Sequence, residues 1–310
     1  MKAVQNCLVL LGKEDEAIEI IDVYTGKNEN SPFTYDFMST KARLQFDNRR
    51  FNEAIDEYNK IIDKYPNNEE NAEAIYWIAR SYINMEEVVQ AENAFIKLQN
   101  KYPKSEYAPQ GMLQNALLQK NLSKPLRADS IFKSLENLYP ESNSASQAGF
   151  ERAIIYYTMG DTLKSIETYK EIYNKYNLND YTLEAKYRVA MFYKNKNQLD
   201  SALYHFEFIK NQDLNKDFAA ESHYRIGEIW KNKKNLDLAI KSYTNVKENY
   251  TSFEDWYSLS LLSLGEIYEE LKEWNNAMEN YKILQEIRLD DDFGKTAKSR
   301  IKRIEKFINK

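Results

Sequence analysis

Residues 78–103 read IARSYINMEEVVQAENAFIKLQNKYP, and the spacing within this stretch decides the fold. Ala91, Phe95 and Leu98 stand at offsets of 0, 4 and 7, which places them on one face of a helix. Ala79 stands twelve residues before Ala91, as expected for a second helix that faces the first. Small residues at these two positions allow the helix backbones to approach closely. The stretch therefore predicts two packed helices joined by a turn.

The same spacing recurs along the whole chain. A small anchor residue returns six times after 37 residues and then after 38, at Ala17, Ala54, Ala91, Ala128, Ser165, Ala202, Ala239 and Ala277. The facing small residues, twelve positions earlier, are Ala42, Ala79, Ala116, Ala153, Ala190, Gly227 and Gly265. A large residue follows each anchor after four positions, at Ile21, Tyr58, Phe95, Phe132, Tyr169, Phe206, Tyr243 and Tyr281. A register kept over eight units predicts a helical-repeat protein.

This pattern resembles the tetratricopeptide repeat (TPR), whose signature reads L-G-x2-Y, then A-x3-F, then P. It is present here as Ile78-Ala79-x2-Tyr82, Ala91-x3-Phe95 and Pro103, and again as Leu264-Gly265-x2-Tyr268 and Ala277-x3-Tyr281. The period is longer than the usual 34 residues, and the closing proline is present only at Pro66, Pro103 and Pro140. The resemblance implies an all-α, right-handed superhelical solenoid of about eight helix-turn-helix repeats plus a C-terminal capping helix.

The period also predicts the organisation of the chain as a single TPR array over residues 1–310. The repeats are expected at residues 1–32, 33–69, 70–106, 107–143, 144–180, 181–217, 218–254 and 255–291. The first repeat contains only the second half of its leading helix, as Val4, Leu8 and Leu11. A cut from a longer array and a naturally short first helix explain this equally well. Gly12 and Gly160 are expected at turns within repeats, and Gly227 and Gly265 at packing contacts.

A capping helix is predicted at residues 293–309. Its apolar stripe is formed by Ala297, Ile301, Ile304 and Ile308, and the opposite face carries Lys295, Lys298, Arg300, Lys302, Arg303 and Lys306. One interpretation is a solubilising cap whose cations also complement the helix C-terminus. The other is a basic docking patch for an anionic membrane or partner.

Composition excludes several classes of protein. Only 14 of the 310 residues are Gly or Pro, too few for a strand-rich or collagen-like chain. Hydrophobic residues at 43% supply enough apolar surface for a core, which argues against disorder. The net charge of −5 argues against a nucleic-acid partner. The single cysteine, Cys7, excludes a disulfide framework, and no apolar run is long enough for a transmembrane segment.

No constellation of residues predicts chemistry. The two histidines, His205 and His223, fall on different helices and should not meet. The glycine-rich phosphate loops, the H-E-x-x-H zinc motif and the G-x-S-x-G nucleophile motif are absent. Asp290, Asp291 and Asp292 lack the spaced ligand set of a calcium loop. We therefore expect no catalytic residues, no metal and no cofactor, and hence no enzyme.

The resemblance implies a concave groove lined by four positions of each first helix. The expected partner-binding residues are Tyr76, Arg80, Leu113, Leu117, Phe150, Ile154, Tyr157, Tyr187, Met191 and Tyr224. Arginines stand toward the N-terminal side of this groove and glutamates toward its C-terminal side. Aromatic and arginine residues contribute most of the energy at many interfaces, so a protein or peptide partner is expected here. The alternative is that some of these residues fill the seam between adjacent first helices, and one tyrosine could do both.

Two turns indicate which kind of TPR protein the chain resembles. Tyr102–Ser105 and Tyr139–Ser142 both read YPxS and resemble turns in bacterial cell-envelope TPR proteins of the BamD and Tol–Pal coordinator type. This implies a non-enzymatic interaction scaffold or adaptor of a bacterial cell-envelope assembly, in the periplasm or at the outer membrane. The alternative is a cytoplasmic peptide-sensing TPR regulator whose effector domain lies outside this chain. The oligomeric state and the partner's identity do not follow from the sequence.

Overall fold

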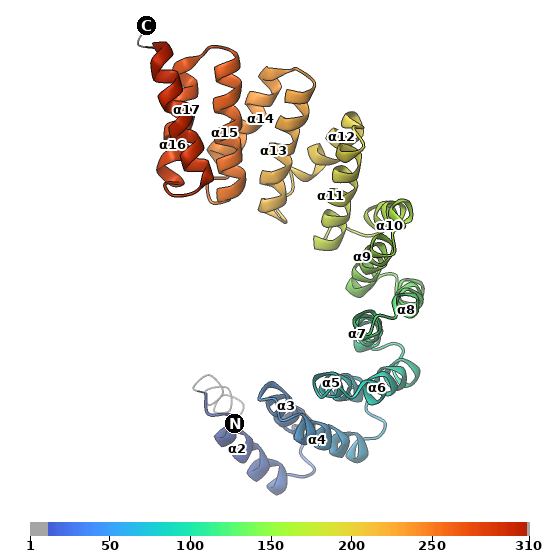
Figure 1. The fold of residues 1–310 in the computed structure, drawn as a ribbon. Coiled ribbons are helices and arrows are strands. Elements are labelled where there is room, and N and C mark those ends of the chain that lie inside the picture. The colour runs from blue at the N-terminus through green and yellow to red at the C-terminus, as the bar shows by residue number, and fades with distance from the viewer. Residues whose placement is uncertain (1–11, 309–310) are drawn as a thin grey trace. The chain divides into compact units, whose positions relative to one another are not determined.

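A computed structural model of the protein describes residues 12–308, which form sixteen helices and no strand (Figure 1). The all-α fold class is thereby confirmed. The chain divides into two compact units, unit 1 (Met1–Met159) and unit 2 (Gly160–Lys310). The arrangement of all repeats as one continuous array stays a prediction. The expected half-helix at Val4, Leu8 and Leu11 lies outside the described residues.

The helices of unit 1 are α2 (Glu14–Lys27), α3 (Thr34–Asp47), α4 (Phe51–Lys64), α5 (Asn71–Asn84), α6 (Val88–Lys101), α7 (Tyr107–Asn121), α8 (Pro125–Leu138) and α9 (Asn143–Thr158). Those of unit 2 are α10 (Thr162–Lys175), α11 (Asp180–Asn195), α12 (Leu199–Ile209), α13 (Lys216–Asn232), α14 (Leu236–Asn249), α15 (Glu254–Glu270), α16 (Trp274–Ile287) and α17 (Asp292–Ile308). Within each unit, every helix packs against the next along the chain. We call α3, α5, α7, α9, α11, α13 and α15 first helices and the even-numbered helices second helices.

The core is built from the periodic small and large residues. The largest fully buried side chains include six of the seven aromatic residues that stand four positions after an anchor: Tyr58, Phe95, Phe132, Phe206, Tyr243 and Tyr281. Each lies on a second helix. The closest approaches are in unit 2, where a Cβ on Gly227 would lie 2.5 Å from a ring carbon of Tyr243, and one on Gly265 as close to Tyr281. The prediction that these two glycines are packing contacts is confirmed.

The turns inside the repeats share one backbone conformation. The residue five positions before each anchor has a positive φ, at Gly12, Arg49, Glu86, Ser123, Gly160, Asn197, Lys234 and Lys272. The expectation of turns at Gly12 and Gly160 is confirmed. The other six are not glycine, although a left-handed conformation costs a non-glycine residue roughly 1 kcal/mol. Backbone hydrogen bonds close these turns, as from Arg50 N to Gln45 O at 2.8 Å.

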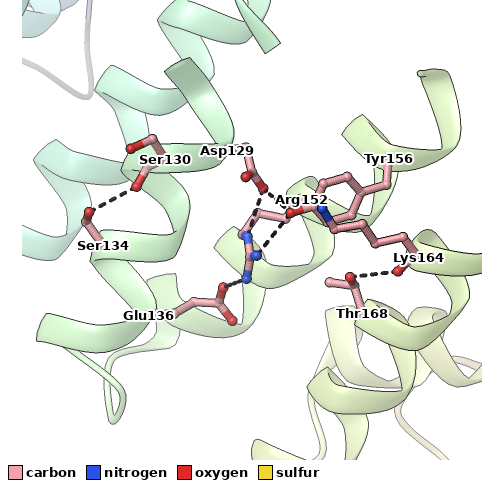
Figure 2. Close-up of polar contacts among 8 residues, drawn as sticks. All are labelled: Asp129, Ser130, Ser134, Glu136, Arg152, Tyr156, Lys164 and Thr168. Carbon is pink, nitrogen blue, oxygen red and sulfur yellow. Dashed lines mark hydrogen bonds and ion pairs between the residues drawn. The ribbon is translucent and has the colours of Figure 1, made fainter. Parts of the chain in front are cut away.

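A buried ionic network joins α8 to α9 in unit 1. Arg152 lies between two carboxylates of α8, with its Nε 3.0 Å from Asp129 and its Nη1 2.6 Å from Glu136 (Figure 2). The Tyr156 hydroxyl accepts from Arg152 Nη2 at 3.2 Å and donates to Asp129 at 2.8 Å. The Arg152 side chain is only 13% exposed. Glu136 therefore helps to raise the pKa of the guanidinium well above its usual value, despite the burial that opposes this.

The helix α17 packs as a cap. Its stripe residues Ala297, Ile301 and Ile304 are buried against the preceding helices. Ile308 was expected on this stripe, but it is 45% exposed because it lies at the end of the helix, where Phe307 stacks on Trp274 instead.

Two of the six predicted cations on α17 form ion pairs with glutamates of α15. Arg300 pairs with Glu266 and Glu269 of α15, and Arg303 pairs with Glu269. Lys298, Lys302 and Lys306 are exposed. One third of the predicted basic face therefore serves contacts between α15 and α17.

Candidate functional site

The ten predicted groove residues fall in both units. Unit 1 contains Tyr76, Arg80, Leu113, Leu117, Phe150, Ile154 and Tyr157, and unit 2 contains Tyr187, Met191 and Tyr224. Tyr76, Leu113, Phe150 and Tyr224 are buried. Tyr157 is 64% exposed, and the other five are partly exposed. The assignment of these residues to partner binding stays a prediction.

The buried members fill seams between helices. The Tyr76 ring of α5 lies 5.5 Å from the Tyr107 ring of α7, measured between centroids. The Tyr224 ring of α13 likewise lies 5.7 Å from the Trp256 ring of α15. Aromatic pairs at such distances stabilise the packing of adjacent first helices. For these two tyrosines, seam filling is therefore the role that the contacts support.

In unit 2, several charged side chains of the first helices pair with one another. Lys194 of α11 binds Glu228 of α13 at 2.9 Å, and Lys231 of α13 binds Glu266 of α15 at 2.9 Å. Arg225 binds both Glu228 and Glu221 at 2.9 Å. The predicted glutamates of the C-terminal side thus already have cationic partners within the protein.

Tyr187 takes part in the same set of contacts. Its hydroxyl donates to Glu221 at 2.6 Å, which links α11 to α13. Burial and this hydrogen bond raise the pKa of Tyr187 well above its usual value, so that the hydroxyl stays a donor. Met191, on the same helix, packs against the core cluster around Phe206.

In unit 1, Arg43 and Arg80 of the first helices α3 and α5 lie on aromatic rings. The Arg43 guanidinium lies 3.5 Å from the Trp77 ring centroid and 3.1 Å from the Asp47 carboxylate. Arg80 donates from Nη1 to the Tyr76 hydroxyl at 3.2 Å, and no carboxylate of residues 12–308 forms an ion pair with it. Cation–π contacts hold guanidinium groups in place without neutralising their charge. Arg80 therefore presents an ordered cation above the Tyr76 and Trp77 rings, whereas Arg43 also pairs with Asp47.

A cavity of about 810 Å³, lined in part by Arg43, lies where α3, α5 and α7 begin. Helix α3 lines it with Tyr35, Asp36, Ser39, Thr40 and Arg43. The other lining residues come from the start of α5, the start of α7 and the turns before them: Glu69, Glu70, Glu73, Lys104, Ser105, Glu106 and Tyr107. We call this the unit 1 cavity. Its size is typical of ligand-binding clefts.

The lining of the unit 1 cavity is acidic. Five carboxylates face two cations, and Glu69 and Glu70 are exposed at the start of α5. Glu73 accepts a hydrogen bond from Trp77 Nε1 at 3.2 Å. Burial and Glu73 together raise the pKa of Tyr107 to about 12, which keeps its hydroxyl protonated at neutral pH. The carboxylate oxygens of the cavity can therefore accept hydrogen bonds from a basic side chain.

None of the ten predicted residues lines the unit 1 cavity. Ser39 and Arg43 do, and they occupy the same positions in the preceding repeat as Tyr76 and Arg80. The acidic and aromatic lining was missed because it comes partly from the turns before the first helices. The signal in the sequence was the pair Glu69–Glu70 directly before a predicted first helix.

The described residues contain no further site of a recognised kind. Within residues 12–308, no group of three or more His, Cys, Asp or Glu is placed to hold a metal ion. No helix in that same range is long and apolar enough to span a membrane. His205 lies on α12 and His223 on α13. Burial, with neighbouring lysines, lowers the pKa of each imidazole to about 4.

We expect both histidines to titrate near pH 4 instead of 6.5. Between these pH values the unfolded chain binds protons that the folded chain does not, so the free energy of unfolding falls as the pH is lowered through this window. Imidazole proton chemical shifts followed against pH give each midpoint, and the His205→Gln and His223→Gln variants assign the two signals. A midpoint above pH 6 for either residue contradicts its burial.

A model of the tetratricopeptide repeat family matches residues 45–117. No curated protein matches the chain. The chain is similar to the solved C-terminal part of a TPR repeat-containing protein from Cytophaga hutchinsonii, at 12% identity over 84% of this chain and 98% of that one, with a TM-score of 0.63. It is also similar to the apo form of RapI, at 15% identity over 94% and 82%, with a TM-score of 0.54. The family model matches part of the chain, and the structural similarities show the fold of a helical-repeat solenoid.

Proposed function

We propose that this protein is a non-enzymatic interaction scaffold that holds a segment of a partner protein against α3, α5 and α7. TPR folds are protein–protein interaction scaffolds, which makes a protein partner the first expectation. The observation that carries the proposal is the unit 1 cavity together with the aromatic-bound Arg43 and Arg80. In unit 2, by contrast, Lys194, Arg225 and Lys231 of the first helices each pair with a carboxylate of the same unit.

The charges of this surface select the partner segment. A lysine or arginine side chain of the partner enters the unit 1 cavity, because carboxylates outnumber cations in its lining. An acidic side chain next to it pairs with Arg80, which has no carboxylate partner in the described part of the chain. Trp77 lies below both arginines, at 3.5 Å from Arg43 and 5.8 Å from Arg80. The segment therefore carries basic and acidic residues close together.

The test is a reversal of charge at the mouth of the unit 1 cavity. Partners captured from native lysate by the wild-type protein are identified, and the affinity of each is measured against the Glu69→Lys/Glu70→Lys variant. We expect affinity for the true partner to fall at least tenfold, because a basic side chain is then repelled. Both glutamates are exposed, so the variant should keep its helical circular dichroism.

The matched control is Glu53→Lys/Asp56→Lys, which reverses two exposed carboxylates of α4 away from the cavity. This variant has the same change in net charge and should bind partners as the wild type does. Equal binding by both variants would show that the partner surface lies elsewhere.

The finer proposal is that the scaffold belongs to a bacterial cell-envelope assembly. Its support is the resemblance of Tyr102–Ser105 and Tyr139–Ser142 to turns of envelope TPR proteins. Fractionation of cells that produce the native protein decides the compartment. Recovery from the cytoplasmic fraction alone would favour the cytoplasmic regulator instead.

A further inference from the structure

An aromatic and basic cluster lies on α10, α11 and α12, apart from the first-helix contacts of unit 2. His205 is 6% exposed and stacks on Tyr193, with ring centroids 5.6 Å apart and planes at 8°. Tyr173 contacts the same imidazole edge-on at 5.7 Å. The Lys170 ammonium lies 5.1 Å from the Tyr193 ring centroid, and the Lys186 ammonium 4.6 Å from that of Tyr173. We call this the Lys170–Lys186 cluster.

The two lysines of the cluster lack counter-ions. Both are partly buried, and Lys186 also lies 4.0 Å from the Phe208 ring centroid. Neither forms an ion pair with any carboxylate of residues 12–308. The other partly buried lysines of unit 2 all do, in the pairs Lys194–Glu228, Lys210–Glu207, Lys231–Glu266 and Lys247–Glu279. Burial without a partner lowers the pKa of Lys186, so the bare ammonium is held at a cost in free energy.

The remaining polar groups of the cluster are suited to donate hydrogen bonds. The hydroxyls of Tyr173, Tyr193 and Tyr204 form no hydrogen bond within the described chain. Burial and the nearby phenols raise the pKa of Tyr173 to about 12, so it remains a donor at neutral pH. His205 Nδ1 is buried without a hydrogen-bond partner. The cluster thus holds two lysines without an ion pair and three hydroxyls without a hydrogen bond among residues 12–308.

We propose that the Lys170–Lys186 cluster is a binding site for a phosphate group. A phosphate dianion supplies two negative charges for the two ammonium groups and several acceptor oxygens for the tyrosine hydroxyls. A carboxylate supplies one charge and two oxygens, which leaves one lysine unpaired. Bound phosphate would therefore replace the counter-ions that the protein itself does not provide.

The test uses the full chain and inorganic phosphate. The imidazole resonances of the two histidines are followed while phosphate replaces chloride at constant ionic strength and pH, with His223→Gln to assign them. We expect the His205 signals to shift and saturate, because the cluster packs around this ring, while the His223 signals stay in place. Unchanged His205 signals up to tens of millimolar phosphate would overturn the proposal.

Charge-removing and charge-keeping variants separate binding from general ionic effects. Lys170→Gln/Lys186→Gln should weaken phosphate binding at least tenfold, whereas Lys170→Arg/Lys186→Arg should retain it. Lys241→Gln/Lys282→Gln removes two exposed lysines of the same unit and should bind as the wild type does. Equal weakening in this control would overturn the proposal, because the effect would then follow net charge alone.

The identity of the anion is settled by three further probes. Acetate should bind at least tenfold more weakly than phosphate, and equal binding would overturn the phosphate assignment. A phosphoserine peptide and its unphosphorylated form then distinguish the source. Tighter binding of the phosphopeptide than of inorganic phosphate supports a phosphorylated protein as ligand, and binding no tighter supports a free phosphate compound.

Discussion

Replacing Arg152 with methionine should lower the free energy of unfolding around α8 and α9 by about 3 kcal/mol or more. The substitution keeps much of the side-chain volume but removes the charge between Asp129 and Glu136. Glu136 is 10% exposed, so its carboxylate then lies in a poorly solvated place without this cation. Hydrogen exchange of the α8 and α9 amides in the full chain measures the loss, expected as a more than hundredfold rise in local opening.

Two further variants test whether the lost stability of Arg152→Met comes from the buried ionic network. Arg188 is 55% exposed and pairs with Glu184 one turn away, so Arg188→Met should cost less than about 1 kcal/mol. The triple variant Arg152→Met/Asp129→Asn/Glu136→Gln removes the stranded charges and should recover part of the stability. Equal losses for Arg152→Met and Arg188→Met would show that the network does not stabilise the α8–α9 pair.

Gly265→Ala should lower the free energy of unfolding of the α15–α16 pair by about 2 kcal/mol. By helix propensity alone, alanine would stabilise the helix relative to glycine by about 1 kcal/mol. The expected destabilisation therefore runs against helix propensity. The reason is space: the added Cβ would lie 2.5 Å from Cε1 and Cζ of Tyr281, whose side chain is fully buried. The two helices must separate or the ring must leave its place. Hydrogen exchange of the α15 and α16 amides measures the change.

Gly26→Ala is the matched control for this substitution. Gly26 also lies in a helix, but a Cβ there would meet nothing within 4 Å. That change should stabilise α2 slightly, by up to about 1 kcal/mol. A neutral or stabilising Gly265→Ala would mean that Tyr281 can be displaced at little cost, and the close helix approach would not explain the glycine.

The fold follows from the sequence because its determinants are periodic and local. The pairing of Gly265 with Tyr281 could be predicted, since the two positions recur in every repeat at fixed spacing. Helix packing needs only that one face be apolar and that small residues stand where the backbones meet. The same reasoning places Ala297 and Ile304 in the core of the cap, and fails for Ile308 only because the helix ends there.

The candidate site could be predicted only in part. Arginines were predicted toward the N-terminal side of the groove, but the unit 1 cavity also requires Glu70 and Tyr107, which lie at the starts of two other helices. Their proximity depends on how three helices begin next to one another, which no spacing along the chain encodes. Likewise, the sequence contains many glutamates, and only the packed structure distinguishes Glu136, which binds Arg152, from those in solvent.

The turn within each repeat has a consequence for how this protein can diverge. Eight copies of one backbone path are present in a single chain, and the left-handed position is occupied by glycine, arginine, glutamate, serine, asparagine or lysine. The eight repeats thus show which residue types this turn position tolerates. This tolerance shows that the path of the turn is enforced by the two helices that flank it, and not by the residue at its centre. Side chains at these turns can therefore drift without changing the pitch of the repeat, and new surface chemistry can arise there at little structural cost.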